Sequence, residues 1–186
     1  MISGKVDDMI GGRGVYLRAL ERCDVERMQK WINDPQIGEF LVFHFPYSLD
    51  QEMAWFDNKQ KPNDRGVVLG IVDRETDRHI GNVGLHGIDW VNSVAEIGIM
   101  IGEKEYWSRG LGTDAMETML RYAFSDLNLE KVFLRVYGFN KRAIRSYEKC
   151  GFVVEATLRD DVFKKGSYHD TIVMGILREE FEARGG

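Results

Sequence analysis

The sequence predicts a single α/β domain of the α+β type, in which a mixed, mostly antiparallel sheet of six to seven strands is flanked by helices. Two observations predict it. Residues 67–101 hold three short apolar runs separated by turns, which is typical of consecutive antiparallel strands. Between residues 99 and 152 the order becomes strand, helix, strand, helix, strand, which indicates a parallel crossover joined to that sheet.

Strands are expected where apolar residues run together between turn signals. We place them at residues 15–18, 67–72, 80–85, 95–101, 132–136, 152–155 and 171–177. Two helices separate the later strands. One spans residues 113–124, where apolar side chains recur at helical spacing. The other is capped by Asn140 and ends at Gly151.

The first third of the chain contains all three prolines and therefore reads as short elements separated by turns. One helix follows Asp24 and ends near Pro35. A second helix opens with the capping box of Ser48 and Gln51 and runs to about Asp57.

Composition excludes several classes of protein. The net charge of −5 disfavours a nucleic-acid partner, because such a protein needs a basic face. No apolar run approaches the roughly 20 residues that span a membrane, and residues 1–9 lack the apolar segment of a signal peptide. We therefore expect a cytoplasmic protein with no membrane partner, one domain over residues 1–186, and flexible ends at 1–12 and 182–186.

The cysteines and histidines give no sign of a metal site. Cys23 and Cys150 lie far apart in the sequence and are expected to be free thiols. The four histidines are not spaced as a metal-binding pair on one helix face, and no CxxC motif is present. We expect no metal cofactor.

The loop from Ser108 to Thr113 is the clearest candidate ligand site, because it lies between a predicted strand and a predicted helix. Gly110 and Gly112 lack Cβ atoms, so the backbone can turn tightly and approach a ligand. The helix that follows offers unpaired N–H groups and the positive end of its dipole, and Arg109 adds a cation. Together these features predict an anion site suited to a pyrophosphate.

Two alternatives compete with this interpretation. The glycines can form a tight turn without a ligand, and residues 110–115 also fit the dinucleotide pattern G-x-G-x-x-G/A. However, eight residues, 102–109, separate the expected strand end from Gly110, whereas a dinucleotide turn follows its strand directly. Too little chain follows Val136 to complete a doubly wound sheet, so a nicotinamide or flavin site is disfavoured.

Four segments of the chain together resemble the GNAT superfamily of N-acetyltransferases, and most of all its Rim-type and spermidine acetyltransferase branch. They are VYLRAL (15–20) with WINDP (31–35), AEIG (95–98) with YWSRGLGTDA (106–115), NKRA (140–143) with YEKCGF (147–152), and GSYHD (166–170). The resemblance spans about residues 15–177, and its second and third segments are the specific ones. Trp107 stands where the superfamily favours Gln or Arg, a departure that the Rim-type branch tolerates.

The resemblance implies acetyl-CoA as a co-substrate and direct attack of a primary amine on its thioester in a ternary complex, without a covalent enzyme intermediate. It also implies which residues hold CoA: Ile99, Met100 and Ile101 through their backbone, the loop residues Ser108, Arg109, Gly110, Leu111, Gly112 and Thr113, and Asn140 with Ala143.

Two residues match catalytic positions of the superfamily. Tyr147 matches the helix tyrosine that protonates the CoA sulfur, and the alternative is core packing beside Ile144 on the same helix face. Glu96 matches the strand carboxylate that accepts the amine proton, usually through water. The alternative for Glu96 is that it only begins a half-exposed strand.

The segment 36–47 is expected to shape the acceptor side. Glu39, Phe43 and His44 are its candidate substrate-binding residues, because aromatic rings beside a carboxylate can hold a cationic amine. The alternative is that the aromatic side chains cap the core beneath a long loop. The acceptor remains open among a protein N-terminus, a polyamine or other small amine, and an amino sugar or antibiotic.

A CoA-binding regulatory module without activity is the non-enzymatic alternative, and the retention of both Glu96 and Tyr147 argues against it. A homodimer is suggested by the resemblance alone.

Overall fold

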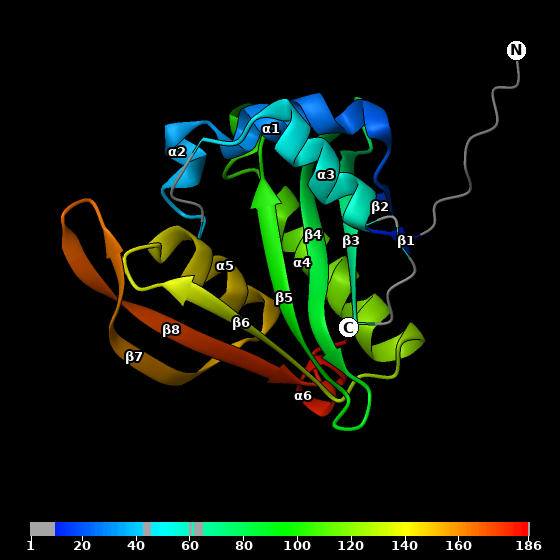
Figure 1. Ribbon diagram of the computed structural model, residues 1–186. Helices are drawn as coiled ribbons and strands as arrows, with labels where there is room; N and C mark the ends of the chain where they lie inside the picture. Colours follow the sequence, from blue (N-terminus) through cyan, green and yellow to red (C-terminus); the bar gives the residue numbers. More distant parts are fainter. Residues whose placement is uncertain (1–9, 43–45, 60, 62–64, 186) are drawn as a thin grey trace, which may run out of the picture.

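The computed structural model describes residues 10–42, 46–59, 61 and 65–185. Within them an eight-stranded sheet has the order β1-β2-β3-β4-β5-β6-β8-β7 (Figure 1). The strands are β1 (Ile10–Gly11), β2 (Val15–Ala19), β3 (Gly66–Asp73), β4 (Arg78–Asp89), β5 (Val94–Ile101), β6 (Lys131–Tyr137), β7 (Val153–Lys164) and β8 (Ser167–Leu177). The paired strands are antiparallel except β5 and β6, which are parallel. The predicted mixed, mostly antiparallel sheet is confirmed.

Helices lie on both faces of this sheet. They are α1 (Val25–Ile32), α2 (Pro35–Gly38), α3 (Leu49–Lys59), α4 (Leu111–Arg121), α5 (Lys141–Cys150) and α6 (Arg178–Glu182). The predicted caps are present. The Ser48 hydroxyl accepts from the Gln51 N–H at 3.2 Å, and the Gln51 side chain accepts from the Ser48 N–H at 2.8 Å. The Asn140 side chain accepts from the Ala143 N–H at 3.2 Å.

Two apolar cores result. The main core lies between the sheet and α4, with α5 packed beside α4, and it contains Leu69, Ile97 and Met116. A smaller core lies under α1, α2 and α3 on the other face and includes Met28, Trp31 and Phe56. Val68 and Met100 of the sheet pack against this smaller core, since neighbouring residues of a strand point to opposite faces.

The structure has one strand more than predicted, and its last two strands are longer. β1 pairs antiparallel with β2 inside the stretch 1–12 that was expected to be a flexible tail; residues 1–9 of that stretch lie outside the described residues. β7 continues to Lys164 and β8 begins at Ser167, joined by a turn in which Lys165 and Gly166 have φ of 51° and 82°. Most β7 side chains are exposed, so the apolar alternation that marks a half-buried strand is missing.

The C-terminal stretch 182–186 was expected to be flexible. Its first residue, Glu182, is the last residue of α6, and Gly186 lies outside the described residues. Among the helices described, none is both long and apolar enough to cross a membrane.

Candidate active site

The parallel strand pair opens a cleft. β5 and β6 pair only through Val94 with Lys131, Ala95 with Val132, and Glu96 with Phe133. Beyond these pairs the two strands diverge (Figure 1), so the edge of β5 from Ile97 to Ile101 is not paired with β6. A cleft of about 1110 Å³ lies here, lined by α1, α3, β4, β5, the glycine loop and α5.

The glycine loop forms one wall of the cleft. Gly110, the residue before α4, has φ of 83°, a left-handed conformation that suits glycine. A Cβ on Gly112 would lie 3.5 Å from Cγ1 of Ile101, at the wall itself. Ser108, Gly110, Gly112 and Thr113 line the cleft. The positions therefore match the predicted anion cradle at a helix N-terminus.

Two loop residues of the predicted set direct their side chains elsewhere. The Arg109 guanidinium lies 5.1 Å from the ring centre of Tyr106. Leu111 packs against the main core. Neither residue is among those that line the cleft.

Trp107 connects the glycine loop to β5 and to α5. Its Nε1 donates to the carbonyl oxygen of Ile101 at 2.8 Å, and the Arg142 guanidinium lies 4.2 Å from its ring centre. The indole thus joins the end of β5 to the first turn of α5. The Ile101 carbonyl already accepts this hydrogen bond. Ile99, Met100 and Ile101, the three strand residues of the predicted CoA set, all line the cleft.

The Asp114 carboxylate fixes the first turn of α4 to the backbone of residues 13–15. It accepts from the backbone N–H groups of Gly14 at 2.7 Å, Val15 at 3.0 Å and Arg13 at 3.0 Å. Sequence reasoning missed this role because the partners lie about a hundred residues away. The signal available was an acidic residue in the first turn of a helix, where the dipole favours it.

α5 supplies the positive side of the cleft. Arg142, Arg145 and Lys149 line it, together with Asn140 and Ala143 from the predicted CoA set. Anionic groups bound beside the glycine loop would therefore meet both backbone N–H groups and cationic side chains.

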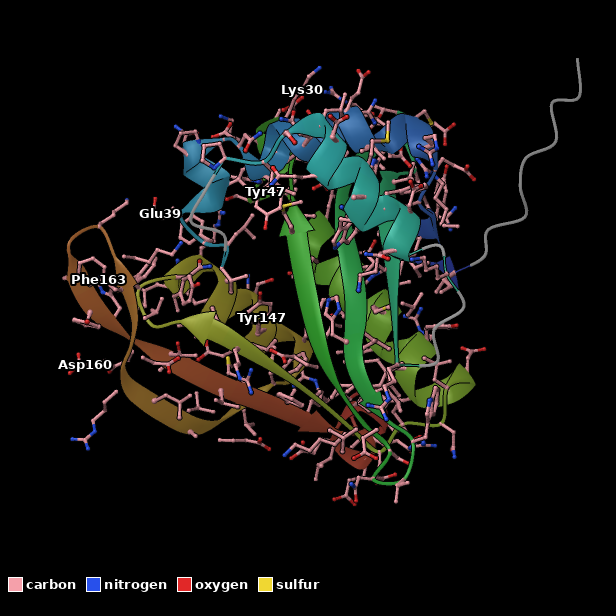
Figure 2. The ribbon with its side chains drawn as sticks, in the orientation of Figure 1. Lys30, Glu39, Tyr47, Tyr147, Asp160 and Phe163 are labelled. Carbon is pink, nitrogen blue, oxygen red and sulfur yellow. The ribbon has the colours of Figure 1, made fainter. Side chains whose placement is uncertain are left out.

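Tyr147 lies in the C-terminal half of α5 and packs partly against the main core. The centre of its ring is 6.1 Å from the centre of the Phe152 ring. Tyr147 also lines the cleft, and Figure 2 shows it beside the gap between β5 and β6. Burial raises the pKa of Tyr147 to about 12, so the phenol keeps its proton at neutral pH. The residue thus combines the packing role and the cleft position that the sequence offered as alternatives.

Glu96 lies where β5 and β6 begin to diverge. Its Oε2 is 3.6 Å from Nη1 of Arg135 on β6, and its side chain is 33 % exposed. It stands opposite His86 of β4, whose Nε2 would lie 3.5 Å from a Cβ placed on Gly98. Partial burial of the imidazole, helped by the charge of Lys59, lowers the pKa of His86. The His86 imidazole, which lines the cleft beside Glu96, is a titratable group that sequence reasoning missed.

The acceptor side differs from expectation. Glu39 does not line the cleft, and its carboxylate forms an ion pair with Nζ of Lys165 at 2.6 Å, in the turn between β7 and β8. Its position near α2, away from Tyr147, is visible in Figure 2. Phe43 and His44 lie outside the described residues. From this segment Ile37, Phe40, Leu41, Val42 and Tyr47 line the cleft.

The wall of the cleft beneath α3 contains a buried carboxyl group that sequence reasoning also missed. Glu52 of α3 is 3 % exposed and lines the cleft. Burial raises its pKa to about 7. The available signal was its position four residues before Phe56, on the buried face of the same helix.

A family model described as an acetyltransferase (GNAT) domain matches residues 15–153. The chain belongs to the GNAT family. It is 33% identical to a spermidine N(1)-acetyltransferase of Vibrio cholerae over 165 residues, which cover 89% of this chain and 94% of that protein. It is 31% identical to the putative ribosomal N-acetyltransferase YdaF of Bacillus subtilis over 174 residues, 90% of this chain and 93% of that one.

A solved structure of the Vibrio cholerae spermidine N-acetyltransferase, in complex with CoA and spermine, matches this GNAT chain with a TM-score of 0.83 at 30% identity. The alignment covers 91% of this chain and 98% of the Vibrio cholerae chain. The resemblance inferred from the four sequence segments is therefore confirmed, and the chain is an N-acetyltransferase of the GNAT family close to the spermidine acetyltransferases.

Proposed function

We propose that this protein transfers the acetyl group of acetyl-CoA to a primary amine of a small polycation, by direct attack in a ternary complex. The observation that carries the proposal is one continuous cleft that joins the glycine loop and the cationic face of α5 to the space beneath α1 and α3. Tyr147 and Glu96 line the same cleft. The Vibrio cholerae relative solved with CoA and spermine supports this choice of donor and acceptor.

The donor half fits CoA. Gly110 and Gly112 leave the first turn of α4 open to a pyrophosphate, with Arg142 and Arg145 nearby to balance its charge. The edge of β5 beyond Glu96, unpaired with β6, offers backbone groups to an extended chain, as a sheet edge does to a peptide.

The chemistry needs a proton acceptor for the amine and a proton donor for the leaving thiolate. An amine with a pKa near 10.4 arrives protonated, so a base must take a proton before its nitrogen can attack. Glu96, directly or through water, takes that proton. The nitrogen then bonds to the thioester carbon, the carbon–sulfur bond breaks, and the leaving thiolate takes the phenolic proton of Tyr147. The acetylated nitrogen loses its second proton as the amide forms, and that proton passes through solvent to restore the phenol, while Glu96 releases the first proton to water. The raised pKa of Tyr147 ensures that the phenol still holds this proton at neutral pH.

A thiol-release assay on the full-length protein tests the proposal. Acetyl-CoA would be mixed with spermidine, with a ribosomal-protein N-terminal peptide and with an amino sugar, and CoA thiol would be measured. We expect release with spermidine. Release with the peptide or the amino sugar alone would change the acceptor class. Acetyl-CoA binding without release to any amine would overturn the proposal and leave a CoA-binding module.

Cytoplasmic localisation and a homodimer remain predictions. One Vibrio cholerae relative is described as dodecameric, so gel filtration with light scattering should cover large assemblies as well as dimers.

A further inference from the structure

The cleft has two sides of opposite charge. On the α5 side its charged groups are Arg142, Arg145 and Lys149. On the side beneath α1 and α3 the acidic groups are Glu52 and Glu96, and Asp161 of β7 is a further acidic group that lines the cleft. The cationic α5 side suits the anionic acetyl-CoA. The carboxylates of Glu52 and Glu96 are therefore available to bind a cationic acceptor.

The two carboxylates differ in their surroundings. Glu96 already faces a cation, because Arg135 lies 3.6 Å away. Glu52 is 3 % exposed, and no described residue hydrogen-bonds to its carboxyl group or forms an ion pair with it. A carboxyl group that is buried without a partner carries a large desolvation cost. It needs a proton of its own or a cation supplied from outside.

The wall around Glu52 suits the methylene chain of a linear amine. Met28, Trp55 and Val68 line the cleft with it, and these side chains belong to or pack against the smaller core. Tyr47, labelled in Figure 2 near the end of β5, adds a ring to the same cleft. Apolar walls with one carboxyl group favour a chain that carries separated cationic nitrogens.

The sheet beneath supplies the floor of this part of the cleft. Gly84 of β4 and Gly98 of β5 stand opposite each other and both line the cleft. Paired residues share a face, so Gly84 faces the same side as its β3 partner Val68, toward α1 and α3. The side chain of Val68 lies beside Gly84, and the imidazole of His86 lies beside Gly98. These groups together form the floor of the cleft next to Glu96.

We propose that Glu52 binds a second cationic nitrogen of the acceptor, separate from the nitrogen that is acetylated near Glu96. Glu52 is then a specificity-determining residue that selects acceptors with two or more amino groups. The proposal rests on the proposed function. The arriving cation supplies the missing partner, and the Glu52 carboxyl group releases its proton as the ion pair forms. The raised pKa of Glu52, about 7, is consistent with this exchange near neutral pH.

Steady-state kinetics on the full-length protein test the assignment with acetyl-CoA at saturation. The acceptors are linear diamines and n-alkyl monoamines of matched chain length. The variants are Glu52→Gln, which removes the charge at nearly constant volume, and Glu52→Asp, which keeps the charge but withdraws it by one methylene. Asp50→Asn is the matched control, because Asp50 is exposed on the same helix and does not line the cleft.

For Glu52→Gln we expect the KM for diamines to rise by about tenfold to a hundredfold. The KM for monoamines, kcat, and the KM for acetyl-CoA should all stay within about twofold. Glu52→Asp should give an intermediate KM for diamines, and Asp50→Asn should match the wild type. An unchanged KM for diamines in Glu52→Gln would overturn the proposal. An equal rise for monoamines and diamines would overturn it too, since Glu52 would then bind the reacting nitrogen.

The two proposals fail in different ways. If the wild type acetylates no amine, the proposed function fails. Calorimetric titration of a diamine into the wild type and into Glu52→Gln then tests Glu52 independently of turnover. Weaker binding in the variant would support the assignment, and equal affinity would overturn it. A retained affinity for acetyl-CoA shows that the variant is folded.

Discussion

The proposed donor half and the proposed acceptor half of the cleft are built in different ways. The donor half consists of the glycine loop, α4 and α5, and local features determine it: a left-handed Gly110, a helix capped by Asn140, and a helix that ends at Gly151. The acceptor half is assembled from α1, α3 and one face of β4 and β5. Local rules locate the donor site, whereas the acceptor site depends on which side chains the tertiary fold brings together. Substitutions in each half should therefore affect different measurements.

The largest expected effect comes from filling the donor half. Gly112→Trp places an indole where a Cβ already lies 3.5 Å from Ile101, so it should block the cradle. We expect no acetyl-CoA binding to be detected by calorimetry, which corresponds to a fall in affinity of more than about 10⁴-fold, or roughly 5.5 kcal/mol. Gly112→Ala is the matched control and should bind almost normally, because its Cβ makes only ordinary contact. Normal binding by the tryptophan variant would remove the loop from the site.

Replacing the phenol of Tyr147 should affect chemistry and not donor binding. Tyr147→Phe keeps the ring against the main core and removes the proton that the thiolate needs. We expect kcat to fall by about 10²- to 10⁴-fold with little change in the affinity for acetyl-CoA. Because the pKa of Tyr147 is about 12, the wild type should also show no loss of activity from this residue up to about pH 10. Unchanged turnover in the variant would leave Tyr147 with packing alone.

The same contrast explains what the sequence could predict. Helix starts and ends, the glycine loop and the parallel crossover follow from near neighbours, and their positions in the fold are confirmed. The contact of Asp114 with Val15 joins residues 99 apart, and no local pattern encodes it. Glu39 was chosen for its charge beside aromatic residues, yet the fold brings Lys165 to it. Glu52 was overlooked although its spacing from Phe56 marks the buried face of α3, because only the tertiary fold determines that its carboxyl group has no partner among the described residues.

The burial of Glu52 should be measurable as a pH-dependent cost in stability. Its pKa rises from the ordinary 4.5 to about 7, so the folded state binds more protons than the unfolded state between these values. Raising the pH across this interval must therefore lower the free energy of unfolding, by on the order of 3 kcal/mol in total. Glu52→Gln has no ionisable group at this position. Its free energy of unfolding should therefore rise relative to that of the wild type as the pH increases from 5 to 8. Urea unfolding of both proteins at pH 5 and at pH 8 measures these free energies. If the free energy of unfolding changes equally with pH in the wild type and in Glu52→Gln, the Glu52 carboxyl group is not buried without a partner.

The smallest expected effect is at Glu96, the residue that lies between the two halves. Because Arg135 already faces its carboxylate and neutral His86 stands opposite, Glu96→Gln should lower kcat/KM by only about tenfold, the equivalent of roughly 1.4 kcal/mol. The acidic limb of the pH–rate profile should shift, while the KM for acetyl-CoA should not change.

Glu155→Gln is the matched control for Glu96→Gln, because Glu155 pairs with Lys131 of the same strand β6 and does not line the cleft. If the profiles of Glu96→Gln and the wild type superimpose, Glu96 does not accept the amine proton. The neutral imidazole of His86 is then the remaining acceptor on the floor of the cleft, and His86→Asn should reproduce the loss that Glu96→Gln failed to give.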